Sequence, residues 1–332
     1  MEWVRERFGA GIVVAAVVCA AFAARAARAA EIVYADGRHE AVEEPRQDSK
    51  GEWTYTREGR RIGLRPGEVA AVVDDAGGET PTIPALADGE NAPDVAGALA
   101  SVLDRKNDGW EMALERVGRT PTRASHDAFV ELTRAKDKAL RARAVPALCA
   151  LHTRESVLAA AAAVLAEKDR GLRRDGAWRL FSVQEIFKRS ESAEVLKQGL
   201  ADKDADVRYV FAVLAPPDDA DAVRILRDEA LKNSDHHIRE TAALELGERG
   251  DASGEALLAT MLTRSRLPGF DAGDEELMTR LLVTEQVAVC RAFAKLGTER
   301  GKAALEKATK SPHQAVRAAA EKALAEIAAK AR

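Results

Sequence analysis

From about residue 93 to the end of the chain, apolar residues recur with the period of an α-helix. In the clearest stretch, Ile238, Ala242 and Leu246 follow at four-residue steps, which places them on one face, and Gly247 offers a C-terminal stop. Similar stretches predict further helices, among them 154–167, 172–189 and 274–296. The pattern therefore predicts a mainly α-helical region over residues 93–332.

A short phrase, Asp followed four residues later by arginine, recurs through this helical region. Its copies are Asp137 with Arg141, Asp169 with Arg173, Asp204 with Arg208 and Asp235 with Arg239, and a last copy has Ser311-Pro312 before Val316-Arg317. Successive arginines are 32, 35, 31 and 78 residues apart, and the last interval has room for two units. A period in this range is typical of stacked repeats. We expect a right-handed α-solenoid of about six two-helix units.

The two charged residues of the phrase have different expected roles. Asp precedes an apolar helical run, so its carboxylate can accept N–H groups of the first turn and interact with the helix dipole. The arginine follows the first aliphatic residue and lies at the border of the buried face, where it can reach an Asp of the next repeat. The arginine row could therefore form structural pairs, or it could line a groove for an acidic peptide or glycan.

These phrases resemble the HEAT-repeat family, and more closely its phycobilisome-lyase-type subgroup, whose second helix opens with Asp and Val-Arg and ends in Leu-Gly. The matching residues are Asp204, Val207 and Arg208; Asp235, Ile238, Arg239, Ala242, Ala243, Leu246 and Gly247; and Val316, Arg317, Ala319, Ala320 and Leu324. The resemblance implies a structural Asp/Arg ladder between repeats. One unit departs from the pattern, because Val289 stands where the arginine belongs.

Residues 31–75 follow another period. Short runs rich in β-branched and aromatic residues, such as Ile32-Val33-Tyr34 and Trp53-Thr54-Tyr55, are separated by glycine turns. They predict a small β meander that weakly resembles SH3-like domains. Residues 76–92 are rich in Gly and Pro and are expected to form a linker to the solenoid at 93–332.

The first 30 residues have the pattern of a signal peptide. Two arginines precede an apolar run at residues 10–24, and Ala27-Arg28-Ala29 supplies small residues for cleavage. Fifteen apolar residues are fewer than the roughly 20 that span a bilayer without strain. We expect export, to the periplasm, with an inner-membrane anchor formed by residues 10–24 as the alternative.

Charge bears on the kind of partner. Without residues 1–30, which hold four Arg and two Glu, the chain has 46 basic and 52 acidic residues, a net charge of −6. A helical repeat that grips nucleic acid needs a basic face to neutralise phosphates. We therefore expect no nucleic-acid partner, and a membrane partner only if the N-terminal segment is uncleaved.

The sequence contains no nucleophile elbow, phosphate loop, paired-cysteine motif or helix-borne zinc motif. Cys149 and Cys290 lie in apolar helical runs several repeats apart and are expected to be buried free thiols. Residues 104–115 resemble a calcium loop but carry Lys106 at a ligand position, and His236-His237 lacks further ligands at a suitable spacing. We expect no catalytic residue, no metal site and no cofactor.

One loop offers a second candidate surface. The stretch 264–273 lengthens an interhelical connection, and inserted loops on repeat proteins often carry contacts. Its candidate binding residues are Arg264, Arg266, Phe270 and Asp271. A tolerated insertion explains the loop equally well.

Together these features favour an exported, non-catalytic scaffold that binds another protein in the cell envelope. Two alternatives stay open. The chain could be an enzyme or accessory related to the HEAT-repeat lyases, or the β domain could be the recognition module with the solenoid as a spacer.

Overall fold

The computed structural model describes residues 29–34, 39–47, 53–57, 60–64, 69–74, 79–81, 86–88, 92–188, 192–268 and 275–330. The expected signal segment, 1–30, lies outside these ranges apart from its last two residues. Contacts within the chain define two compact units, whose described parts span 29–210 and 211–330.

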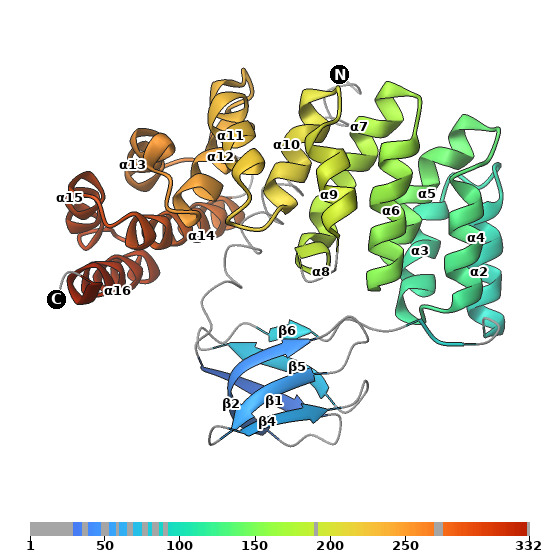
Figure 1. Cartoon of the computed structure of the whole chain (residues 1–332), viewed down its shortest axis with the longest axis horizontal. Coiled ribbons are helices and arrows are strands. Elements are labelled where there is room, and N and C mark those ends of the chain that lie inside the picture. Colours follow the sequence, from blue (N-terminus) through green and yellow to red (C-terminus); the bar gives the residue numbers. More distant parts are fainter. Residues whose placement is uncertain are drawn as a thin grey trace. The chain divides into compact units, whose positions relative to one another are not determined.

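The N-terminal strands form one antiparallel sheet in the order β4-β3-β2-β1-β5-β6 (Figure 1). The strands are β1 (Ala29–Tyr34), β2 (His39–Gln47), β3 (Trp53–Arg57), β4 (Arg60–Leu64), β5 (Val69–Asp74) and β6 (Glu79–Pro81). Consecutive strands pair from β1 to β4, and β5 returns to the other edge of β1. The last strand, β6, extends past the expected boundary at residue 75.

The rest of the described chain is helical. The first unit contains α2 (Pro93–Leu103), α3 (Trp110–Arg119), α4 (Arg123–Leu132), α5 (Lys138–Ala150), α6 (Arg154–Ala166), α7 (Arg170–Arg179), α8 (Gln184–Lys188) and α9 (Ala193–Leu200). The boundary between the two units along the chain, after residue 210, falls within α10 (Ala205–Leu214). The second contains α11 (Ala220–Asp228), α12 (His236–Glu248), α13 (Glu255–Thr263), α14 (Glu275–Leu296), α15 (Glu299–Ala308) and α16 (Gln314–Lys330).

Helices of the second unit form two layers. Within each pair the helices pack on each other, as α11 does on α12 and α15 on α16, while α12 also contacts α14 and α14 contacts α16. On the other layer α13 contacts α15. In the first unit α4 contacts α6 and α5 contacts α7 in the same way. The helices of each unit therefore stack in pairs, as in a helical-repeat protein.

Small residues let these layers approach closely. Gly247 does not end its helix, because α12 continues to Glu248. A Cβ at Gly247 would lie 2.8 Å from the Cβ of Ala292, so the glycine is needed for packing of α12 against α14. The left-handed conformation that ends this helix occurs at Gly250, with φ of 78°.

The helix expected over 172–189 is interrupted. Helix α7 ends at Arg179, a 3₁₀ turn covers Leu180–Val183, and α8 follows. Leu180, Phe181 and Val183 are all buried. A tighter 3₁₀ turn therefore separates two α-helical segments where one continuous helix was expected.

Both cysteines in the described ranges, Cys149 and Cys290, are free and buried, and burial raises the pKa of each thiol to about 12.

None of the helices in the described ranges is long and apolar enough to span a bilayer. The alternative anchor at residues 10–24 lies outside those ranges.

Candidate functional site

The arginine of every copy of the repeated phrase closes the turn in front of its own helix. In each case Nη1 donates to the carbonyl oxygen six residues earlier. These bonds run from Arg141 to Ala135 (3.0 Å), from Arg173 to Glu167 (2.8 Å), from Arg208 to Asp202 (2.8 Å), from Arg239 to Asn233 (2.6 Å) and from Arg317 to Ser311 (2.8 Å). The guanidinium thus satisfies carbonyls that the turn leaves without a helical partner.

In four of the five copies, the residue that supplies this carbonyl also closes the turn with its side chain; in the first copy this residue is Ala135, which has no side-chain acceptor. A side-chain oxygen two residues before the cap accepts from the backbone N–H of the capping position. The pairs are Glu167 with Asp169 (2.8 Å), Asp202 with Asp204 (2.7 Å), Asn233 with Asp235 (2.9 Å) and Ser311 with His313 (3.3 Å). In these four copies the repeated phrase is therefore seven residues long, beginning with Glu, Asp, Asn or Ser. This first position was not predicted from the sequence, although polar residues recur there at a fixed offset.

The Asp residues cap the helices that follow them. Asp137 accepts from the N–H of Ala139 at 2.8 Å, Asp169 from that of Leu172 at 3.1 Å, and Asp235 from that of His237 at 2.8 Å. Asp204 accepts from the N–H of Asp206 at 3.0 Å.

Contacts between repeats differ from the expected Asp/Arg ladder. Three of the caps pair with a cation one repeat earlier, and this cation is not the phrase arginine. The pairs are Arg105 with Asp137 (2.9 Å), Lys138 with Asp169 (2.6 Å) and Arg170 with Asp204 (2.7 Å). Lys138 and Arg170 are the first residues of α5 and α7, so their side chains reach sideways to the next turn. The phrase arginines, held by their own turns, reach acids at the first phrase position instead, Arg141 to Glu167 at 3.0 Å and Arg173 to Asp202 at 3.5 Å.

These ion pairs lower the pKa of two of the capping carboxyl groups. The hydrogen bond from Lys138, with backbone N–H groups, lowers the pKa of Asp169. Burial works to raise the pKa of Asp204, but hydrogen bonds from Arg170 and from the Asp206 N–H, and the charge of Arg174, lower it overall. Both groups therefore stay ionised near neutral pH.

Along this side of the first unit, the cationic side chains are more exposed to solvent than the carboxylates with which they pair. The side chains of Arg105, Lys138 and Arg170 are 71%, 62% and 74% exposed, whereas those of their partner carboxylates are 26%, 31% and 2% exposed. Lys136, Lys168 and Lys203, each directly before a capping Asp, are exposed as well. We call these six cations, Arg105, Lys136, Lys138, Lys168, Arg170 and Lys203, the basic edge.

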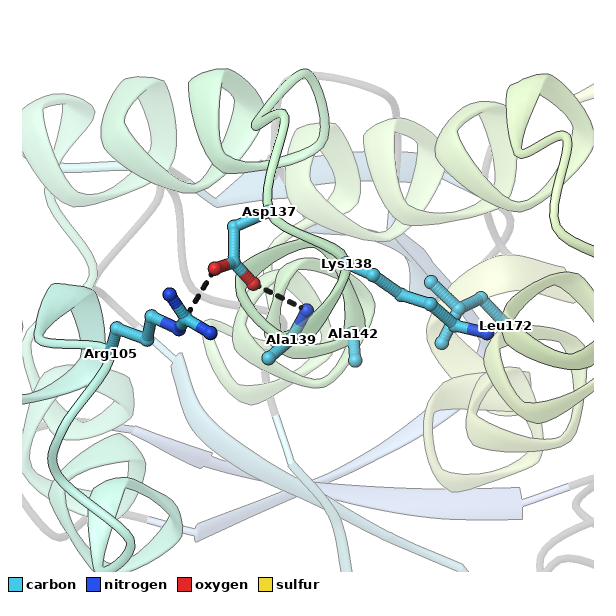
Figure 2. A pocket seen from close by; sticks show the side chains of 6 residues that line it. All are labelled: Arg105, Asp137, Lys138, Ala139, Ala142 and Leu172. Carbon is cyan, nitrogen blue, oxygen red and sulfur yellow. Dashed lines mark hydrogen bonds and ion pairs between the residues drawn. The ribbon is translucent and has the colours of Figure 1, made fainter.

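An open hollow of about 560 Å³ lies on the basic edge (Figure 2). Ala139, Ala142 and Leu172 give it apolar walls, with the Arg105–Asp137 pair on one side. Figure 2 shows Lys138 extending from α5 over the other side toward Leu172. The hollow combines an apolar surface with a charged rim, which suits a side chain of a bound peptide.

The other candidate loop is tied to the core at its first residue. Arg264 donates to Glu240 of α12 at 2.6 and 3.1 Å and also to Glu285 of α14, and its side chain is 13% exposed. Arg266 is exposed. Phe270 and Asp271 lie outside the described residues. Arg264 is thus engaged by two carboxylates and is not a free contact residue.

This cluster holds a carboxyl group with an unusual pKa. Burial, together with the charge of Glu240, outweighs the attraction of Arg264 and raises the pKa of Glu285 to about 7. Oε1 of Glu285 is buried and has no hydrogen-bond partner among the residues that the structure describes. His237, at the N-terminus of α12, has its pKa lowered by burial and by neighbouring His236.

Neither near-motif forms an ion site in the described part of the chain. Arg143 fills the inside of the 104–109 turn, where it donates to four carbonyl oxygens, those of Val102, Asp104, Arg105 and Asn107, at 2.7–3.2 Å. His236 and His237 stack on each other, with ring centroids 3.9 Å apart. Across the described residues, no group of three His, Cys, Asp or Glu side chains is placed to hold a metal ion.

Comparison with known proteins gives likeness only at the level of structure. No family model matches the chain, and no curated protein sequence matches it. The Escherichia coli protein YibA is similar over 70% of this chain and 81% of its own, with 14% identity and a TM-score of 0.45. Human deoxyhypusine hydroxylase in complex with glycerol covers 71% of this chain and 96% of its own (14% identity, TM-score 0.31). A designed armadillo repeat protein covers 70% and 99% (16% identity, TM-score 0.32).

Proposed function

We propose that this chain is an exported, non-catalytic HEAT-type scaffold that binds another protein of the cell envelope. The observation that supports it best is the basic edge, where each repeat turn is closed by its own hydrogen bonds and leaves equivalent side chains exposed at one position per repeat. A rigid surface with a repeated exposed position is what an extended protein partner can follow. The signal-like segment 1–30 supports export.

Two other functions make different predictions. An enzyme or accessory related to the HEAT-repeat lyases would bind a chromophore or modify a protein, so the purified protein would be coloured or would change the mass of its partner. An SH3-like recognition module would place binding in the β strands of residues 29–81, with the helices as a spacer. The exposed repeated positions favour the scaffold function over both.

Photo-crosslinking in the source organism tests the proposal. A photoreactive residue is placed in the full-length chain at Ala139 on the basic edge or at Glu194 on α9, both exposed. After irradiation of intact cells, mass spectrometry identifies the crosslinked partner and the N-terminus of the chain. We expect a chain that lacks residues 1–30 and one dominant envelope protein, captured from at least one position. A full-length precursor in the cytosol, or no crosslinked protein from either position, would contradict the proposal.

A further inference from the structure

The lysines of the basic edge recur at the same point of successive turns. Lys136, Lys168 and Lys203 each stand between the first position of the phrase and the capping Asp. None of the three forms an ion pair with another described residue, and all three are exposed. Their ammonium groups are therefore available to a ligand that crosses the turns.

The spacing of these lysines fits an extended chain. Packed helices lie about 8–10 Å apart, so equivalent side chains of neighbouring repeats are separated by roughly 10 Å. A peptide in the extended polyproline II conformation advances about 3.1 Å per residue and, with three residues per turn, returns its side chains to the same face at every third residue. Three residues of such a peptide match one repeat, so a carboxylate at every third position could meet one lysine in each turn.

The acids of this region do not cancel its attraction for carboxylates. Asp137, Asp169 and Asp204 point their oxygens at helix N–H groups and at Arg105, Lys138 and Arg170. Arg105, Lys138 and Arg170 are more exposed than the carboxylates with which they pair, so a ligand would contact the cations first. The chain as a whole has a net charge of −4, so attraction of an acidic ligand would be confined to the basic edge.

The hollow also favours a ligand that carries an apolar side chain. It opens between the turns of α5 and α7, its apolar walls are Ala139, Ala142 and Leu172, and its rim holds the Arg105–Asp137 pair and Lys138. A small aliphatic side chain beside a carboxylate would bury its surface there while the carboxylate stays at the rim.

From these observations, and resting on the proposed scaffold function, we propose that the basic edge binds an extended acidic segment of the partner protein. The segment carries carboxylates at about every third residue and places an aliphatic side chain in the hollow. A polyphosphate or nucleic-acid backbone fits less well, because it carries no aliphatic side chain that could fill the hollow.

Peptide binding to the full mature chain tests this site. The probe is a fluorescein-labelled peptide of four Asp-Ser-Val units, measured by fluorescence anisotropy at low salt. The test variant combines Lys136→Glu, Lys168→Glu and Lys203→Glu, and the matched control combines Lys197→Glu, Lys307→Glu and Lys322→Glu, which change the same number of exposed charges elsewhere. We expect binding to weaken about tenfold or more in the test variant and less than about twofold in the control. Circular dichroism checks that both variants fold.

A second variant separates the hollow from the charges. Ala142→Leu fills the hollow and keeps every charge, so it should weaken the Asp-Ser-Val peptide several-fold and leave a peptide of four Asp-Ser-Ser units unchanged. The proposal is overturned if the wild-type chain fails to bind the Asp-Ser-Val peptide at millimolar concentration, or if both triple variants lose affinity equally. Equal binding of a twelve-nucleotide oligothymidylate, lost in the test variant, would overturn it in favour of a general polyanion site. In each case a partner crosslinked from Ala139 or Glu194 would leave the scaffold function standing.

Discussion

The arginine of each repeated phrase has main-chain carbonyl oxygens as its main hydrogen-bond partners, and carboxylates come second. Arg239 shows this most simply, since its Nη1 lies 2.6 Å from the Asn233 oxygen and 2.8 Å from that of Ser234. Its contribution is to hold a turn closed so that Asp235 can cap α12. The same bonding explains why arginine recurs although its expected Asp partners pair elsewhere.

Replacing Arg239 by Ala should destabilise the protein. The substitution leaves one partly buried carbonyl, that of Asn233, and one exposed carbonyl, that of Ser234, without their charged donor, which we expect to lower the free energy of unfolding by about 1–2 kcal/mol. Urea denaturation followed by circular dichroism measures this. Arg266→Ala, at an exposed position, is the control and should change stability by less than about 0.5 kcal/mol. Equal effects of the two substitutions would show that the turn does not depend on its arginine.

Glu285 predicts a pH dependence of stability. Its pKa is about 7 in the folded chain and 4.5 in its ordinary state, so between these values the folded state binds more protons than the unfolded state. This group therefore stabilises the fold less as pH rises from 4.5 to 7, and its cost is constant above pH 7. Glu285→Gln removes the titration. We expect the variant to gain stability relative to wild type, on the order of 2 kcal/mol, between pH 5 and pH 8.

Thermal unfolding of both proteins across this pH range measures the difference. Glu299→Gln, in which the carboxylate lost was 87% exposed, serves as the control and should show no such trend. A constant difference between Glu285→Gln and wild type would mean that Arg264 keeps Glu285 ionised throughout.

At the scale of single residues, the sequence predicted the capping positions but not which cation pairs with which carboxylate. An Asp before an apolar run is a local signal, so the capping positions could be placed from the sequence. Whether Lys138 or Arg141 reaches Asp169 depends on the direction of each side chain at the start of α5, and both stand within four residues of Asp137. The offset of the carbonyl that receives the arginine depends on turn geometry, which no residue type reveals alone.

At the scale of elements, helix existence followed from periodicity more reliably than helix ends did. The helix expected over 154–167 corresponds to α6, and that over 274–296 to α14. The interpretation of Gly247 as a helix stop was wrong, because its missing side chain serves the contact with Ala292. Glycine is compatible with both roles, and only the neighbouring helix distinguishes them.

Two glycine substitutions should therefore have opposite signs. Gly247→Ala places a Cβ within 2.8 Å of the Ala292 Cβ and 3.1 Å of a Leu258 methyl, so we expect a loss of about 1–3 kcal/mol. Gly97→Ala, inside α2 with no heavy atom within 4 Å of the new Cβ, should gain about 0.5–1 kcal/mol. Chemical denaturation of both variants measures the pair. A stabilising Gly247→Ala would contradict the close approach of α12 to α14.

At the scale of the molecule, stability should be local, because each helix pair packs mainly on its neighbours. Gly247→Ala should therefore speed amide hydrogen exchange in α12, α13 and α14 and leave α4 to α6 at their wild-type rates. Exchange measured peptide by peptide with mass spectrometry tests this. A uniform increase from α2 to α16 would show that the whole chain opens as one unit.

The seven-residue turn also makes the repeats interchangeable parts. Each turn is closed by bonds within its own phrase, and a cation of the preceding repeat pairs with the capping Asp at Asp137, Asp169 and Asp204. Removal of residues 169–203 would bring Asp204 into the place of Asp169, opposite Lys138, with its own arginine, Arg208, four residues on. A chain built this way can lengthen or shorten by whole repeats through duplication and deletion, while the rules that close each joint stay the same.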